Sequence, residues 1–322
     1  MSDAATTNAA APAPAAGTKR WIKGPAWDLV WILNPLWLVP LLLLLSMDHE
    51  DARNSPVDSL FFLLAVPLWF GHRISSAWLA YATPGYRPLL ARQRMRFVVA
   101  PLAIVAACFA VLLAPESLLP MPLLERVFCL VVLDYLLVSH HFAAQHFGLL
   151  SLYRARAGRA SAPFVRRLDR CFALVVGGGI VVVAQALSGS IAFQERWIDP
   201  WLGEVGSEWL ARMLHDGGIA LVVLLSGLVL CVELLAPRPS LPRMAYVLAL
   251  AAMVLMALVA RDPFLFLVLW SVQHWSAAMG LTSLAAGGGD TPSGTRWQRL
   301  LAAVNRRGWA VLLVLAVISA LL

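Results

Sequence analysis

Charged residues are scarce in this sequence. Asp, Glu, Lys and Arg make up 13% of its 322 residues, whereas apolar residues make up 60% and the mean hydropathy is +0.76. A soluble domain usually has about 25% charged and about 45–50% apolar residues. The composition therefore excludes an ordinary soluble enzyme and indicates a protein that crosses a membrane many times.

Cysteine is also infrequent. The four cysteines lie in or beside apolar runs, and no two of them form a CxxC pair. This excludes a disulfide framework and a cysteine zinc knot, so we interpret them as small buried apolar residues. The net charge of +7 does not indicate a nucleic-acid partner, because the basic residues lie in short loops between apolar runs. Such loops are the orientation signal of membrane proteins.

Nine apolar runs approach the length of about 20 residues that a helix needs to cross a bilayer. Their approximate bounds are 28–46, 58–81, 97–114, 127–153, 171–193, 217–236, 243–260, 263–284 and 308–322. The last run is short, so a bundle of eight spans is the alternative. The sequence thus predicts an all-α, polytopic integral membrane helix bundle, with residues 19–322 forming a single transmembrane helical domain. Residues 1–18, rich in Ala, Pro and Thr, are expected to be a disordered tail.

The charges of the loops predict how these spans are oriented. Arginines dominate the loops near residues 87–96 and 154–170, whereas acidic residues dominate the loops 47–58 and 194–216. Because basic loops stay in the cytoplasm, the N-terminus is expected on the cytoplasmic side. The basic loops also predict contacts with anionic membrane lipids.

Histidines lie inside three of the predicted spans. A polar side chain in the hydrocarbon layer is costly, and it usually faces the interior of a bundle and marks a functional site. Counting about 1.5 Å of rise per residue from the cytoplasmic ends places five histidines about 12–20 Å deep. The sequence therefore predicts that these five meet in one layer: His72, His140, His141, His146 and His274.

Neutral imidazoles in such a layer have two stable arrangements. They can hydrogen-bond to one another and to nearby polar groups, or they can share a metal, for which imidazole is the commonest ligand. Five histidines at one depth favour the metal. One ion cannot easily take all three histidines of the fourth span, because His140 and His146 lie about 100° and 140° round an ideal helix from His141. Which of His140 and His141 is the ligand stays open.

Other polar or aromatic residues near the histidines are expected to support the site. Asp134 is the only acid near the layer, so the ligand set should consist of histidines, either alone or completed by a glutamine or water. Asp134, Gln145 and Gln273 are expected to orient the ligands through hydrogen bonds, and the alternative for each is an ordinary contact between helices. Arg73 is expected either to bind an anionic substrate or headgroup or to reach the cytoplasmic face. Tryptophans about one turn before two of the histidines are expected to wall the site: Trp69 and Trp270.

Three short motifs carry a resemblance to known membrane proteins. They are Gly-His-Arg at 71–73, His-His-x4-His-Phe-Gly-x4-Tyr-Arg at 140–154, and Gln-His-Trp at 273–275. They resemble bacterial multi-span proteins with intramembrane histidine clusters. They are also similar to the bacterial membrane carotene-cleaving dioxygenases, in which histidines from separate helices hold a non-haem iron. The resemblance implies a multi-pass protein of the bacterial inner membrane, with iron ligands among His72, His140 or His141, His146 and His274.

The function expected from these observations is that of an oxygenase-like oxidoreductase. Its histidines would hold non-haem iron, with copper or zinc as alternative metals, and its substrate would be a lipophilic small molecule. An electron-donor protein is an expected partner if the reaction needs one. A transporter or proton relay is the first alternative, although the sequence lacks the internal repeats of many transporters. A bis-histidine haem protein is the second, and a structural membrane protein without a site is the third.

Overall fold

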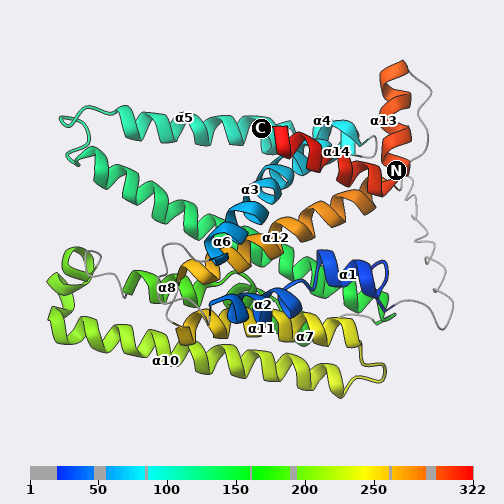
Figure 1. Ribbon diagram of the computed structural model, residues 1–322. Coiled ribbons are helices and arrows are strands. Elements are labelled where there is room, and N and C mark those ends of the chain that lie inside the picture. Colours follow the sequence, from blue (N-terminus) through cyan, green and yellow to red (C-terminus); the bar gives the residue numbers. More distant parts are fainter. Residues whose placement is uncertain are drawn as a thin grey trace, which may run out of the picture.

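The computed structural model describes residues 20–46, 56–83, 86–159, 162–188, 194–260, 263–287 and 295–321. Most of these residues are helical, and none of them lies in a strand (Figure 1). The predicted all-α class is therefore confirmed for this part of the chain, while the tail predicted at 1–18 lies outside it. The π-helices carry the letter η. In chain order the helices are α1 (Pro25–Trp31), α2 (Pro35–Ser46), α3 (Pro56–Ala77), η2 (Trp78–Ala82), α4 (Arg87–Arg92), η4 (Met95–Val99), α5 (Ala100–Leu113), α6 (Leu123–Arg156), α7 (Pro163–Phe172), η5 (Ala173–Gly177), α8 (Ile180–Ser188), η6 (Gln194–Ile198), α10 (Asp199–Leu234), α11 (Leu241–Ala260), α12 (Pro263–Ala286), α13 (Arg296–Arg306) and α14 (Gly308–Leu321).

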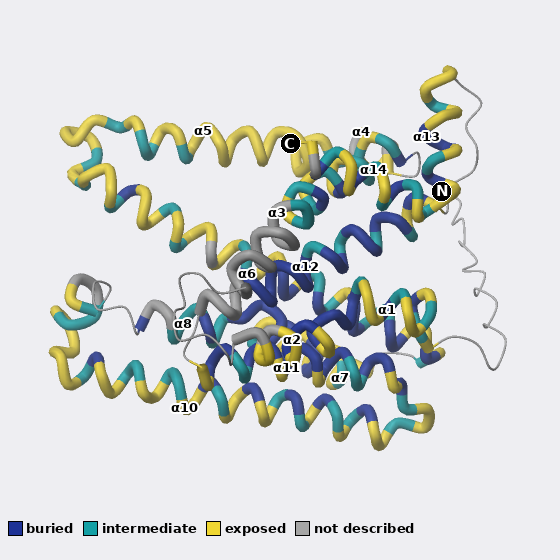
Figure 2. Tube along the Cα trace, viewed as in Figure 1, coloured by how far each residue is buried: buried dark blue, intermediate teal, exposed yellow. Residues whose placement is uncertain are grey.

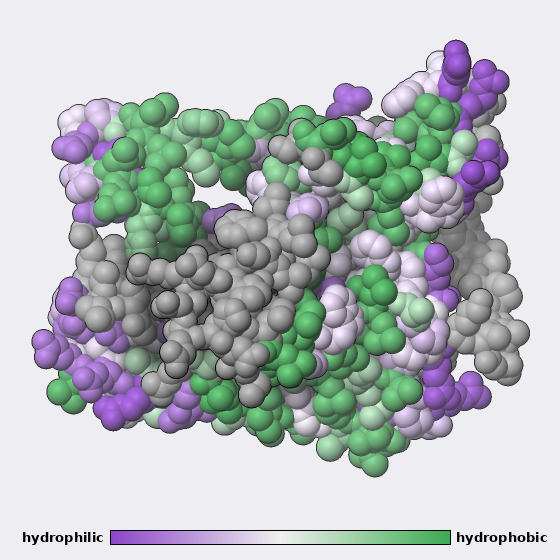
Figure 3. Space-filling model, viewed as in Figure 1, coloured by the Kyte–Doolittle hydropathy of each residue, from purple (hydrophilic) through white to green (hydrophobic). Residues whose placement is uncertain are grey.

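Several helices are long and apolar enough to cross a membrane. Among the described residues these are Met95–Leu113, Leu123–Arg156, Asp199–Leu234 and Leu241–Ala260. The pair α13 and α14, bent by 107°, adds a fifth if it is counted as one span. Figure 3 shows apolar surface between two edges where hydrophilic residues gather. The structure supports a membrane protein, but it does not confirm the predicted count of nine spans.

The first predicted span, 28–46, is not one continuous helix. It is broken between α1 and α2, because Pro35 lacks an amide N–H and disfavours helical backbone at Asn34. Helix α12 provides polar partners for the break. Gln273 Nε2 donates to the carbonyl of Ile32 at 3.2 Å, and Asn34 Nδ2 donates to Ser276 Oγ at 2.5 Å. These bonds attach the N-terminal segment to the helix that carries His274.

The fifth predicted span, 171–193, is also interrupted, at a run of three glycines. Helix α7 continues into η5, and the chain then turns at Gly179, whose φ is 64°. A Cβ at Gly177 would lie 2.7 Å from Cβ of His146, so η5 and α6 touch here without a side chain between them. Small residues allow such close packing between membrane helices.

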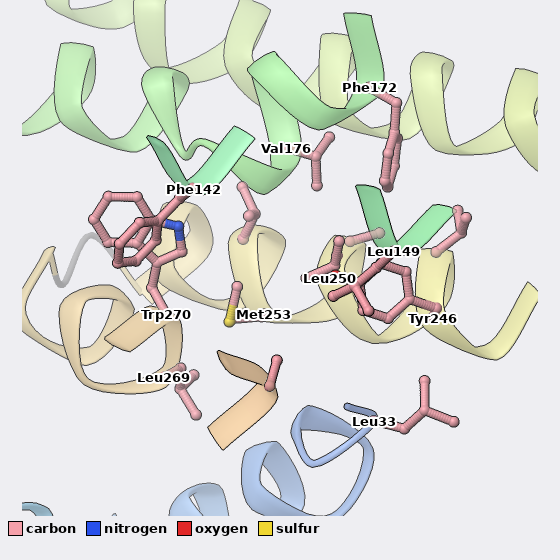
Figure 4. Close-up of a cluster of buried hydrophobic side chains, with 14 of the residues drawn as sticks. Leu33, Phe142, Leu149, Phe172, Val176, Tyr246, Leu250, Met253, Leu269 and Trp270 are labelled. Atoms are coloured by element: carbon pink, nitrogen blue, oxygen red, sulfur yellow. The ribbon is translucent and has the colours of Figure 1, made fainter. Parts of the chain in front are cut away.

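The buried core lies where α11, α12, η5 and the second half of α6 meet (Figure 2). Figure 4 shows its side chains, with Phe142 against Trp270 on one side and Leu149 and Leu250 beside Tyr246 on the other. By contrast, the described residues of α5 are not buried, and most of the first half of α6 is exposed. These apolar surfaces suit contact with lipid.

A chain of buried ion pairs joins α6, α7, α10 and α11. Asp169 accepts from Arg154 and from Arg243, the latter at 2.6 Å, and Glu233 accepts from Arg243 and Arg159. The 154–170 segment carries the basic residues used to predict orientation, but two of its arginines also hold the helices together. Their acidic partners lie in other helices, so the sequence pattern alone did not reveal this role.

Candidate metal centre

Three of the predicted histidines come together from three helices. His72 of α3, His141 of α6 and His274 of α12 each offer a ring nitrogen, and these nitrogens all lie within 4.8 Å of one another. The ring centroids are 4.8 Å apart for His72 and His274, and 5.0 Å apart for His141 and His274. We call this group the histidine triad. The three helices cross near the middle of the molecule (Figure 1).

Close packing around α3 brings the triad together. A Cβ added at Gly71 would lie 2.6 Å from Sδ of Met279 on α12 and 3.2 Å from Oγ of Ser319 on α14. The absence of a side chain at Gly71 therefore lets α3 approach both helices beside His72.

Two residues of α6 fix the position of His274. The ring of Phe142 stacks on the His274 imidazole, with centroids 3.5 Å apart and planes 8° apart. Gln145 Nε2 donates to the backbone carbonyl of His274 at 3.0 Å. Gln145 therefore acts on the main chain of His274 and not on its ring, so the bond is a contact between α6 and α12, as in the alternative given for this residue.

Ring nitrogens of the triad lack hydrogen-bond partners. His274 is fully buried, and neither of its nitrogens has a partner; the buried Nδ1 of His72 has none either. None of the hydrogen bonds between described residues joins the three rings. An unsatisfied buried polar atom costs about 1–3 kcal/mol, and such atoms are rare. The arrangement therefore disfavours a simple hydrogen-bonded histidine cluster and fits a shared metal.

The geometry needs little adjustment to hold an ion. Two imidazole nitrogens bound to one metal at about 2.1 Å lie at most about 4.2 Å apart. Small side-chain rotations would bring the triad nitrogens from within 4.8 Å to that spacing. An all-imidazole set suits iron, copper or zinc, whereas magnesium and calcium prefer oxygen ligands.

A cavity of about 550 Å³ adjoins the triad. Ligand-binding pockets commonly measure about 300–1,000 Å³. Trp69 and Trp270 line it, as the sequence predicted. The full lining consists of three tryptophans, a phenylalanine, two triad histidines and four other residues: Trp69, His72, Arg73, Asp134, Val138, His141, Phe142, Trp270, Ser271 and Trp275.

Two predicted histidines lie outside the triad. His140 and His141 are both exposed, but among the described residues only His141 belongs to the group that could hold a metal. His146 is fully buried, and its Nδ1 lies 2.5 Å from the hydroxyl of Tyr246. The angular offset of His140 and His146 from His141 explains why one site cannot gather all three.

The remaining predicted residues have distinct positions. Asp134 and Arg73 both line the cavity. The guanidinium carbon of Arg73 lies 5.1 Å from the ring centroid of Trp69. Gln273 is fully buried and donates to Ile32, so it holds the α1–α2 break, and no hydrogen bond between described residues joins it to the triad.

Trp275 of the cavity, Phe142 and Tyr246 were not foreseen as parts of the site. Phe142 directly follows His141, and its aromatic ring was the available signal. Tyr246 lies on α11, far along the chain, and no local pattern connects it with His146. Comparison with family models, curated proteins and solved structures finds no match for this chain, so the interpretation of the site depends on its own residues.

Proposed function

We propose that this protein is a membrane oxidoreductase that acts on a lipophilic substrate. In this proposal His72, His141 and His274 hold a non-haem iron. One observation carries the proposal. Three imidazoles from separate helices present nitrogens within 4.8 Å of one another, and the nitrogens of His274 have no other partner. Three protein ligands leave coordination positions for other molecules.

The cavity supports a lipophilic substrate. Its aromatic side chains offer a wide apolar surface, and the exposed half of α6 leads from the apolar exterior to His141. The metal would supply the activation of dioxygen. The protein would position the ligands and shield the substrate: Phe142 and Gln145 position His274, and the tryptophans exclude water from the bound substrate.

The oxidant determines which partners are needed. In a dioxygenase reaction both atoms of dioxygen enter the product, so no separate reductant is consumed. An electron-donor protein is required if one atom leaves as water. The resemblance to carotene-cleaving dioxygenases favours the reaction without an electron donor. Of the ligands that this resemblance implies, the proposal keeps only the three histidines of the triad.

The membrane placement belongs to the same proposal. The protein would be a multi-pass protein of the bacterial inner membrane, with its N-terminus in the cytoplasm and about nine spans. The basic loops and the apolar surface between two hydrophilic edges support this placement.

Elemental analysis of purified protein, together with an optical spectrum, tests the proposal. We expect about one iron per chain, with loss of metal in His72→Ala, His141→Ala and His274→Ala. His140→Ala is the matched control, because this exposed neighbour lies outside the triad. Protein that holds no iron, copper, manganese or zinc and cannot be loaded with them would refute the proposal. A Soret band would favour haem.

A line of buried polar groups favours proton relay as a second candidate. The Tyr153 hydroxyl donates to Asp28 at 3.0 Å, its ring lies 5.9 Å from that of Tyr246, and Tyr246 contacts His146. Protein in liposomes tests this candidate. Proton flux that is abolished by Tyr246→Phe would favour it over the oxidoreductase, whereas liposomes without flux would exclude it.

A further inference from the structure

Arg73 lies at the triad but has no anionic partner among the described residues. It follows His72 on α3 and lines the same cavity. Its guanidinium lies over Trp69, and no ion pair or hydrogen bond from it to another described residue is present. Other arginines in the bundle, such as Arg154 and Arg243, are paired with acids.

Arg73 is exposed, although the sequence predicts a span over residues 58–81. A charged side chain within a span usually meets a counter-charge, a polar pathway or the membrane interface. The guanidinium carbon lies 5.1 Å from the centroid of the Trp69 ring, and no partner among the described residues occupies the N–H donors along the edge of the group. That edge matches a carboxylate, which can accept two parallel hydrogen bonds.

The other charge in the cavity lies at a different height. Asp134 precedes His141 by seven residues, which corresponds to about 10.5 Å along α6. Arg73 is instead adjacent in sequence to a triad member. Arg73 and Asp134 thus line one cavity together with aromatic side chains, and no ion pair between described residues joins the two.

We propose that the cavity binds a lipophilic carboxylate, such as a long-chain fatty acid, with its carboxylate on Arg73 and its apolar chain against Trp69, Phe142, Trp270 and Trp275. This inference names the substrate class of the proposed oxidoreductase and rests on that function for its catalytic meaning. Binding itself depends on charge and apolar surface, so it does not require the metal.

Fluorescence titration of the full chain in phosphatidylcholine nanodiscs tests the inference. The probes are cis-parinaric acid and its methyl ester, which differ in charge at the head. We expect saturable energy transfer from tryptophan, with the acid binding about tenfold or more tightly than the ester, as for a charge-assisted hydrogen bond. Arg73→Gln should reduce the affinity for the acid to that for the ester, and Arg73→Lys should retain part of the preference.

Arg170→Gln is the matched control. Arg170 also lies over an aromatic ring, with its guanidinium carbon 5.3 Å from the centroid of Phe147, but it does not line the cavity. This variant should keep the preference for the acid. Equal affinity of the wild-type protein for acid and ester would overturn the inference, and so would an undiminished preference in Arg73→Gln. If Arg73→Gln fails to fold, the affinities of the wild-type protein for the acid and for its methyl ester still test the inference.

A triad variant separates this inference from the proposed function. His274→Ala should lose metal while it still prefers the acid to the ester. If wild-type protein binds the acid selectively but holds no metal, the oxidoreductase proposal fails and the carboxylate site stands. If it holds metal but does not distinguish acid from ester, the carboxylate site fails and the metal site stands.

Discussion

The ring of Phe142 lies parallel to that of His274, with the planes 8° apart and the centroids separated by 3.5 Å. The same phenylalanine also packs against Trp270, at a centroid distance of 3.8 Å. The contact fixes one imidazole of the triad from a helix that also supplies another, His141. Metal affinity should therefore depend on an apolar side chain that cannot bind metal.

Phe142→Leu tests that dependence. Leucine keeps much of the apolar volume but lacks the flat face that orients His274. Residues that position ligands typically change metal affinity by about 10–100-fold, and we expect a loss in this range. Competition with a chelator of known affinity measures it. The control is Phe147→Leu, since Phe147 contacts Arg170 instead of the triad; equal losses in both variants would contradict the expected role.

Tyr246→Phe should destabilise the fold without removing the metal. The change deletes the hydroxyl beside Nδ1 of His146, whose Nε2 already lacks a partner. A buried polar atom left unsatisfied costs about 1–3 kcal/mol. Thermal unfolding in detergent measures the loss, and Tyr81→Phe, at a tyrosine that is 64% exposed, should cause little change. Metal loss on Tyr246→Phe would instead place His146 in the metal site.

Gly177→Ala should also destabilise the protein. The new Cβ would lie 2.7 Å from Cβ and Cδ2 of His146, so α6 and η5 would have to separate. Overpacking of a core costs about 1–3 kcal/mol. Gly217→Ala is the matched control, because a Cβ there meets nothing within 4 Å. The same unfolding assay compares the two, and an unchanged Gly177→Ala would show that the contact relaxes easily.

Arg243→Met should be the most destabilising of these substitutions. It leaves Asp169 and Glu233 buried with one fewer cation between them. Removal of one partner from a buried ion pair typically costs about 3–5 kcal/mol. Arg212→Met removes an exposed pair with Glu208 and should have little effect. Similar unfolding temperatures for the two variants would mean that the buried network contributes little.

Metal should stabilise the wild-type fold and not the triad variants. A ligand that binds only the folded state stabilises it by about 2.7 kcal/mol at a free concentration of about 100 times Kd. Added iron should therefore raise the unfolding temperature of wild-type and His140→Ala protein, and a chelator should lower it. His274→Ala should respond to neither. A response that persists in His274→Ala would place the metal elsewhere.

Local properties of the sequence determined much of this protein. The apolar runs specified helices and a membrane protein, because hydropathy and helical length are properties of neighbouring residues. Depth along three runs also brought His72, His141 and His274 to one layer, because a helix rises by a constant distance per residue. Two of the three tryptophans of the cavity, Trp69 and Trp270, followed from their positions about one turn before histidines.

Only the tertiary structure decided how the helices face one another. Neighbouring residues on a helix point about 100° apart. The sequence therefore did not show which of His140 and His141 faces the other two histidines, and the packing of α6 against α3 and α12 decided it. The pairing of His146 with Tyr246, the contact of Phe142 with His274 and the buried pairs of Asp169 all join residues that are far apart in the chain or on different helices. On helices that are apolar on most sides, the sequence gives no preferred face, and packing alone sets it.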